Sequence, residues 1–190
     1  MFKRAGGMRS TSGVKHKGKR MSRILEDHAR FLQGQDNGVR ADLSGADLHK
    51  MNLSGANLNY ANLAGARMDG TSLKEAKLSF ADMSKANLRE ADMRRADLTE
   101  TNLSEANLTG AQLNGVELFR ANLHKAVLRR TDLTAANFRN ADVSGADFHG
   151  ATMTTTVLRE TNLEGIDLRG LDLSTTLMPR NWKQEAEPKA

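Results

Sequence analysis

The sequence predicts an all-β solenoid, and two features of its 190 residues lead to this fold class. The first is a strict five-residue period, because all 27 positions reached in steps of five from Leu43 to Leu173 hold Leu, Met, Phe or Val. The second is the composition, with 38% hydrophobic but only 4% aromatic residues, which is poor in the bulky side chains of a conventional globular core. A solenoid does not need such a core, because each coil buries its apolar residues against the neighbouring coils.

The period of five excludes an amphipathic helix and a straight strand. A helix turns about 100° per residue, so a five-residue step would scatter the leucines around its axis. In a strand, an odd step would place successive leucines on opposite faces. Ala stands two positions before 18 of the 27 centres, and Asp or Asn stands one position before 19 of them. Ala and the centre therefore share the inside, Asp or Asn faces outward, and the remaining two residues form a corner of a polygonal coil.

The repeat Ala-(Asp/Asn)-Leu-X-X resembles the pentapeptide repeat family over residues 41–175, with every repeat in register. The resemblance implies a right-handed quadrilateral parallel β-helix with four repeats, or 20 residues, in each coil, and hence about seven coils. It also implies an interior filled with side chains. Family members that confer fluoroquinolone resistance resemble duplex DNA in shape and charge and bind DNA gyrase, so the resemblance offers that activity as one expectation.

The residues before the repeats are expected to divide into a tail and a cap. Residues 1–23 contain eight Lys or Arg and no acidic residue, so we expect residues 1–20 to form a disordered basic tail. Residues 21–40 should form an N-terminal cap, with a short helix over Met21–Gln33 and a turn behind it. The cap is needed because an open solenoid end exposes unpaired strand edges.

The other end of the chain should be capped as well. Beyond the β-helix at residues 41–175, we expect residues 176–190 to form a C-terminal cap and tail. Leu177, Met178 and Trp182 should fold over the last coil, and the final residues should fray.

The basic character of the protein is concentrated outside the repeats. The whole chain carries a net charge of +5 and has a sequence pI of about 9.7. Residues 1–40 account for +7, residues 41–175 for −3 and residues 176–190 for +1. The repeat region is therefore mildly acidic, so nucleic acid or anionic lipid could be contacted only through the basic residues 1–23. The alternative, which we favour, is an unstructured extension that binds neither.

No motif in the sequence indicates catalysis. The chain has no cysteine, which excludes a thiolate nucleophile and Cys-ligated metal sites, and the common catalytic and nucleotide-binding motifs are absent. Carboxylates such as Asp42 and Asp92 recur in a turn-forming position where Asp hydrogen-bonds nearby backbone. His49 and His149 would share one face five coils apart, too far to bind one metal ion. The sequence predicts no enzyme activity, no cofactor and no metal.

Candidate binding residues are the departures from the repeat. If residues 20 apart stack, Tyr60 and Phe80 lie one above the other in an outward corner, with Phe119 in the neighbouring outward position two coils on. Exposed aromatic clusters are typical of contact surfaces, so this group is our first candidate for protein binding. The alternative is that these are incidental surface aromatics.

A second candidate surface is basic. Arg89, Arg129 and Arg169 fall in one outward position, and Arg130 and Arg67 lie beside it. Such a column of arginines could bind an acidic protein partner. The alternative is a solvated face that binds nothing.

These observations favour a non-enzymatic protein-protein interaction module or scaffold, whose partner and oligomeric state the sequence does not indicate. The alternative is a DNA mimic that binds DNA gyrase or topoisomerase, which would need a more acidic surface than −3 provides. A further alternative is nucleic-acid contact through the basic N-terminal segment. No apolar run of about 18 residues is present, so we expect no membrane span and a cytoplasmic protein of bacterial type.

Overall fold

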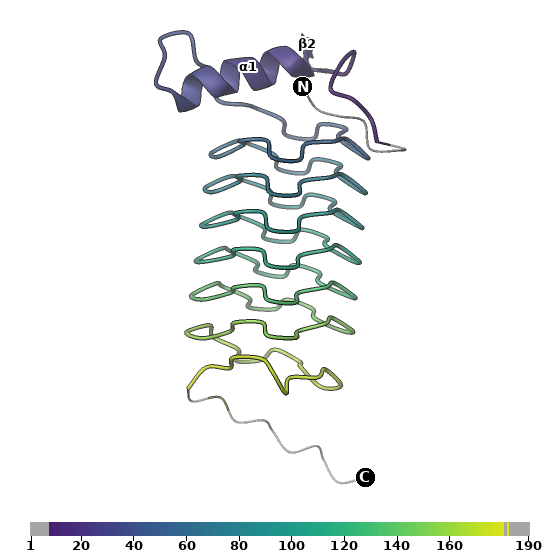
Figure 1. Ribbon diagram of the computed structural model, residues 1–190, viewed down its shortest axis with the longest axis vertical. Coiled ribbons are helices and arrows are strands. Elements are labelled where there is room, and N and C mark those ends of the chain that lie inside the picture. Colours follow the sequence, from purple (N-terminus) through teal and green to yellow (C-terminus); the bar gives the residue numbers. More distant parts are fainter. Residues whose placement is uncertain (1–7, 181, 183–190) are drawn as a thin grey trace.

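The computed structural model describes residues 8–180 and 182, which form a column of stacked coils with a helix at one end (Figure 1). Strand β1 (Lys15–His16) and strand β2 (Lys19–Arg20) form a short antiparallel hairpin. Helix α1 (Met21–Leu32) follows directly and lies across the top of the column, with the coils descending from it toward the C-terminal end.

The coils repeat every 20 residues. From Asp42 to Asp142, each outward position pairs in parallel with the position 20 residues later, as Asp42 does with Asn62 and Asn62 with Asp82. The last such pair joins Val157 and Leu177. Four pentapeptides therefore complete one coil, and the neighbours of a side chain along the column are the residues 20 positions before and after it. This is the register expected of the β-helix.

Each pentapeptide makes one inward pair and one corner. Ala41 is 1% and Leu43 0% exposed, and the equivalent residues line the interior along the column. The N–H of Ala46 donates to the carbonyl of Leu43 over 3.0 Å, with Gly45 between them at φ 65°. This is a turn whose third residue needs a positive φ. The carboxylate of Asp42 accepts the N–H of Ser44, which explains why Asp and Asn dominate this position.

Helix α1 covers the first coil with one side. Met21 and Ile24 are buried, and Nδ1 of the buried His28 accepts the N–H of Ala41 over 3.1 Å. Burial lowers the pKa of His28, which therefore acts as a neutral acceptor within the cap. His28 is thus a packed residue of the junction between helix and coil.

Residues 8–20 are ordered against the first coil, so the prediction of a disordered tail over residues 1–20 was wrong for this part. The N–H of Arg9 donates to the carbonyl of Lys50 over 2.6 Å, and the N–H of Asn52 donates to the carbonyl of Arg9 over 3.1 Å. Arg9 thereby forms a parallel bridge with Met51. The first coil offers an edge of unpaired backbone groups, and composition alone does not reveal that a polar segment can pair with it.

Salt bridges hold the same segment on the outside of the coil. Lys17 Nζ donates to Oδ2 of Asp42 over 2.5 Å, and the guanidinium of Arg9 lies 3.5 Å from Asp47. Two basic residues of this segment, Arg9 and Lys17, therefore have acidic partners on the first coil. Residues 1–7, the remainder of the predicted tail, lie outside the described residues.

At the C-terminal end, Met178 and Trp182 pack against the core, as expected for a cap. Leu177 does not fold inward, because it stands in the outward position paired with Val157 and is 44% exposed. The expectation for Leu177 was wrong because the coil register extends two residues further than the repeat pattern. Residues 183–190, the expected frayed terminus, lie outside the described residues.

Candidate protein-binding surface

Two aromatic side chains stack at one corner of the column. Tyr60 and Phe80 have φ angles of 64° and 60°, so both occupy the left-handed corner position. Their ring centroids are 5.0 Å apart and the ring planes differ by 5°, because the 20-residue register sets one side chain above the other. Tyr60 is 46% and Phe80 45% exposed. The structure thus brings together the first two residues predicted for binding.

Phe119 lies beside this corner but does not extend the stack. The next two residues of the corner column are Glu100 and Arg120, whose charged groups lie 3.8 Å apart. The guanidinium carbon of Arg120 sits 5.0 Å from the ring centroid of Phe119, in a cation–π arrangement. Phe119 is therefore half-buried under a cation, one position away from the corner column.

The predicted basic column is interrupted and largely neutralised. The 20-residue register places Thr109 and His149 between Arg89, Arg129 and Arg169. Arg129 donates to the carboxylate of Asp147 over 2.5 Å. Arg169 donates twice to its neighbour Asp167, over 2.8 and 2.6 Å, and this side-chain hydrogen bonding lowers the pKa of Asp167.

One of the two flanking arginines, Arg67, is in the same situation. Arg67 donates to Asp69 over 2.9 Å. Exposed pairs of this kind contribute little to stability, but they remove the net positive charge that an acidic partner would recognise.

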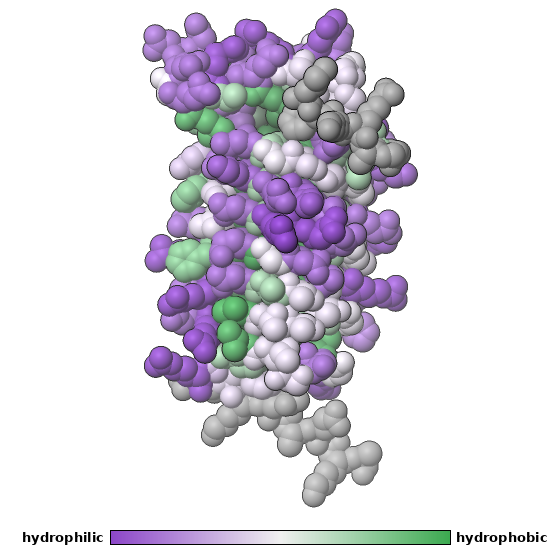
Figure 2. Space-filling model, in the orientation of Figure 1, coloured by the Kyte–Doolittle hydropathy of each residue, from purple (hydrophilic) through white to green (hydrophobic). Residues whose placement is uncertain are grey.

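No face of the column carries a strong charge of either sign. The face that begins with Asp42 has the largest acidic excess, and Lys85 and Lys125 partly balance it. Its carboxylates are those of Asp42, Asp82, Glu105, Asp142 and Glu164. On the side in view in Figure 2, hydrophilic residues dominate and apolar ones form small separate patches.

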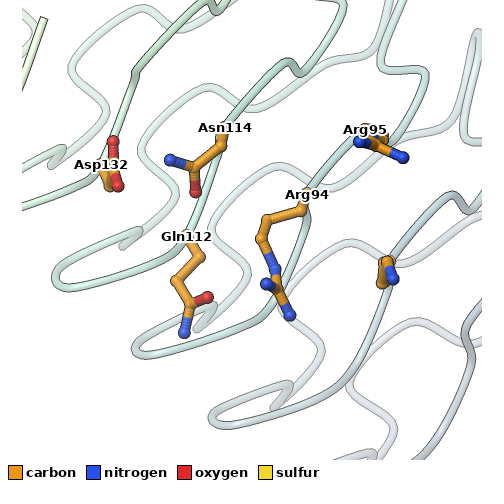
Figure 3. A pocket seen from close by; sticks show the side chains of 6 residues that line it. Arg94, Arg95, Gln112, Asn114 and Asp132 are labelled. Atoms are coloured by element: carbon orange, nitrogen blue, oxygen red, sulfur yellow. The ribbon is translucent and has the colours of Figure 1, made fainter. Parts of the chain in front are cut away.

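An open hollow of about 490 Å³ lies halfway along the column (Figure 3). Its side chains come from successive coils, and Arg94, Arg95, Gln112, Asn114 and Asp132 line it. Arg94 donates twice to Asp92, over 2.8 and 2.7 Å, and Asp132 accepts the hydroxyl of Thr134 over 2.7 Å. The groups that could act in catalysis are thus engaged in structural contacts.

Where the pKa of an Asp or Glu in the described chain is displaced, the direction is opposite to the one that a general acid needs. Each Asp or Glu whose pKa is displaced has a lowered pKa. The hydrogen bond from Arg94 lowers the pKa of Asp92, and the hydrogen bond from His49 lowers the pKa of Asp47. A general acid at neutral pH needs a raised carboxyl pKa. Among residues 8–180 and 182, no three His, Asp or Glu side chains come together in a way that could hold a metal ion.

The sequence did not reveal one polar cluster on the first coil. Nδ1 of His49 lies 2.7 Å from the guanidinium of Arg9 and 2.7 Å from the carboxylate of Asp47. The spacing of Asp47 and His49 follows from the repeat, but Arg9 comes from outside it. The five-residue period does not predict the contact between Arg9 and His49.

A column of 20-residue coils with paired outward positions defines a repeat protein of the β-solenoid class. The family model described as Pentapeptide repeats matches it in eight copies, over residues 39–74, 52–89, 71–110, 81–118, 117–154 and 136–174. The chain belongs to the pentapeptide repeat family.

Solved structures of other family members resemble this chain at low identity. A trypsin-treated variant of QnrB1, a plasmid-mediated fluoroquinolone resistance protein, is 25% identical, with 75% of this chain and 79% of that chain covered and a TM-score of 0.32. The protein alr5209 from Nostoc PCC 7120 is 28% identical, with coverages of 67% and 77% and a TM-score of 0.38. HetL from Nostoc sp. strain PCC 7120, involved in regulation of heterocyst differentiation, is 27% identical, with coverages of 80% and 88% and a TM-score of 0.26.

A search of curated proteins gave no match. No helix in the described part of the chain has the length and apolar character needed to cross a membrane.

Proposed function

We propose that the protein is a non-enzymatic interaction module, a rigid right-handed rod of about seven coils that docks on a protein partner through the corner formed by Tyr60 and Phe80. The observation that carries this proposal is the exposed stack, whose two rings lie 5.0 Å apart. We propose the cytoplasm as the compartment. The repeats at residues 41–175 form the rod in this proposal, and the segments on either side cap it.

The stack suits recognition because it is already ordered. The two rings hold each other in place, so a partner gains a flat apolar contact without fixing free side chains. The fold itself does not require aromatic residues at these corners. Other corners hold Gly, charged or small residues, such as Gly65, Lys85 and Ala135, which meet the same positive φ without exposing a large apolar side chain. Two stacked aromatic residues at one corner, Tyr60 and Phe80, therefore indicate a role other than stabilising the fold.

Phe119 and the arginine column are proposed as flanking contacts. Phe119 continues the apolar surface beside the stack, but the cation above it must move before a partner can cover the ring. Arg89, Arg129 and Arg169 would contribute to partner choice through charge, with a small share of the binding free energy because two of them already have carboxylate partners.

The charge distribution does not favour the alternative of a DNA mimic that binds gyrase. Such a mimic needs a nearly continuous acidic surface, whereas salt bridges such as Arg129–Asp147 place both signs on the column. The alternative makes a clear prediction of its own. If the purified protein inhibited or protected supercoiling by gyrase, it would replace our proposal.

The proposal is tested by affinity capture with quantitative mass spectrometry, using the wild type, the double variant Tyr60→Ser/Phe80→Ser and a control. The matched control is Lys85→Ser/Glu105→Ser, because these residues form another stacked corner pair with their charges 3.9 Å apart. We expect the aromatic variant to lose specific partners that the control retains. An identical set of partners for all three proteins would reject the Tyr60–Phe80 corner as the docking surface.

A further inference from the structure

We propose that a phosphate group binds in a second hollow, at the junction of the β1–β2 hairpin, helix α1 and the first coil. This hollow measures about 190 Å³, and its basic lining includes His16, Lys19 and Arg40. Ile24 and Val39 supply an apolar wall. The site is separate from the Tyr60–Phe80 corner and does not depend on the function proposed for it.

The two acidic residues of the hollow are already neutralised. Asp27 forms salt bridges with Arg23, at 3.1 Å, and with Arg30. Asp42 accepts a hydrogen bond from Lys17 over 2.5 Å. Neither carboxylate is therefore free to balance the remaining basic groups of the hollow.

Three basic side chains of the hollow have no anionic partner within the described chain. Neither Lys19 nor Arg40 forms a salt bridge among residues 8–180 and 182, and Nε2 of His16 is buried without a hydrogen-bond partner there. A buried polar nitrogen without a partner costs free energy, and so does a cluster of unbalanced cations. Both costs disappear if an anion occupies the hollow.

The hairpin itself shows the same imbalance. Lys15 stands directly opposite Arg20, and His16 opposite Lys19. Like charges in directly opposed positions destabilise an antiparallel pair. The turn that joins the strands, with Lys17 at φ 48° and Gly18 at φ 80°, keeps the four residues in this register. The opposed basic residues destabilise the hairpin. Residues that lower the stability of their own element are typical of a binding site rather than of a structural element.

A phosphate group matches the chemistry of these donors. They come from β1, β2 and the segment before the first coil, so they approach from several directions, as the oxygens of a tetrahedral dianion require. The volume is smaller than the roughly 300–1,000 Å³ of pockets for drug-sized ligands, so the ligand is small. The apolar wall of Ile24 and Val39 favours a phosphate ester with a short apolar group over free phosphate.

The binding test uses the full-length protein in low-salt buffer without phosphate, titrated in a calorimeter with inorganic phosphate and with phenyl phosphate. We expect saturable binding at one site. Tighter binding of phenyl phosphate would assign an ester as the ligand, and equal affinities would assign free phosphate, and both results support the site. Lys19→Gln and Arg40→Gln should each weaken binding by about tenfold or more, because each removes a charged hydrogen bond. Lys125→Gln, on the shaft away from the hollow, is the matched control and should bind as the wild type does.

Thermal unfolding gives a second readout that a purely structural role would not produce. Without ligand, Lys19→Gln should unfold at a higher temperature than the wild type, because one of the unbalanced cations around the hollow is removed. The same variant should lose the rise in Tm that phosphate gives the wild type. The proposal requires both results for Lys19→Gln: a higher Tm than the wild type without ligand, and no rise in Tm when phosphate is added.

Several results would overturn the proposal. One is the absence of saturable heat with both phosphate compounds, and another is equal weakening by Lys125→Gln. A third is tight binding of a short DNA duplex that Lys15→Gln and Arg20→Gln weaken more than Arg40→Gln does. That result would assign the exposed side of the hairpin to nucleic acid and leave the hollow without a ligand.

Discussion

Thr71 donates its hydroxyl hydrogen to the carbonyl oxygen of Leu48, 23 residues earlier, over 2.7 Å. Thr71 stands in the inward position that Ala holds in most repeats, and it is fully buried. Its hydroxyl therefore joins one coil to the coil before it, from inside the column. The same relationship recurs at Thr101–Leu78, Thr156–Leu133, Thr161–Phe138 and Thr176–Met153.

Replacing Thr71 with Val should lower the free energy of unfolding by about 1 kcal/mol, the net worth of a typical buried hydrogen bond. The loss stays modest because the carbonyl of Leu48 also accepts the N–H of Met51 over 3.0 Å. Urea denaturation measures the difference. Thr71→Ser keeps the hydroxyl and is the matched control. If Thr71→Val were as stable as the wild type, the hydroxyl contact would have no energetic role.

Replacing Leu103 with Asp should destabilise the shaft far more strongly. Leu103 is 0% exposed, so the variant buries a carboxylate among apolar side chains without a partner. We expect a loss of several kcal/mol, about the cost of an uncompensated buried charge. Thermal unfolding followed by circular dichroism measures it. Thr109→Ala, at an outward position, should change the free energy of unfolding by less than about 0.5 kcal/mol. An unchanged Tm for Leu103→Asp would contradict the inward placement of the repeat centres.

The four-repeat coil that the family resemblance implies predicts the 20-residue register and the Tyr60–Phe80 stack. The period of five predicts the inward residues. It does not predict the contacts of segments outside the repeat. Arg9 lies on the first coil beside Met51 because an edge of the coil was unpaired, and that edge is a property of the folded column. Composition led to the opposite expectation for this segment, since its charge is typical of disordered chains.

The corner residues show a second limit of the pattern. Their choice follows from the residue 20 positions away, which the pentapeptide does not contain. The side chain of Lys125 reaches over Gly145, and that of Lys50 reaches over Gly70. Elsewhere the pair is charged, as in Glu100–Arg120. These columns of stacked corner residues can be predicted only once the number of residues in a coil is known.

Acid should destabilise the protein in a defined range of pH. The hydrogen bond from Arg94 lowers the pKa of Asp92 in the folded state, and the hydrogen bond from Ser144 lowers that of Asp142. A carboxyl whose folded pKa lies below its unfolded value of about 3.9 stabilises the fold above that pH, and this contribution is lost as the pH falls through the folded pKa. We therefore expect the Tm to fall first below about pH 6.5, where the unfolded chain protonates His28 and the folded chain does not, and to fall further below about pH 4 as these carboxylates are protonated.

The Asp92→Asn variant tests the cause of this decline. Its Tm should fall less steeply below about pH 4 than that of the wild type, because Asn cannot be protonated in that range. Asp36→Asn, in the segment between helix α1 and the first coil, is the control and should follow the wild type. Parallel curves for Asp92→Asn and the wild type would show that Asp92 does not contribute to the acid sensitivity.

The positive φ of the corner positions predicts opposite effects of Ala→Gly and Gly→Ala substitutions on the free energy of unfolding. Ala135 is exposed and has φ 57°, a conformation in which a β-carbon costs about 1–2 kcal/mol. Glycine is freer in the unfolded chain, which offsets about 0.5–1 kcal/mol of the relief. Ala135→Gly should therefore stabilise the protein by up to about 1 kcal/mol, measured by urea denaturation.

Gly145→Ala should have the opposite sign. Gly145 has φ 67°, and a β-carbon there would lie 3.2 Å from Cγ of Lys125. We expect a net backbone cost of up to about 1 kcal/mol, the reverse of the exchange at Ala135, with a further loss from the close contact. In a Lys125→Ala background the contact disappears and only the backbone cost remains, so Gly145→Ala should destabilise that protein less. If the substitution cost the same free energy in both backgrounds, the lysine stem would not lie over this corner, and the pairing of residues 20 apart would not explain where the glycines stand.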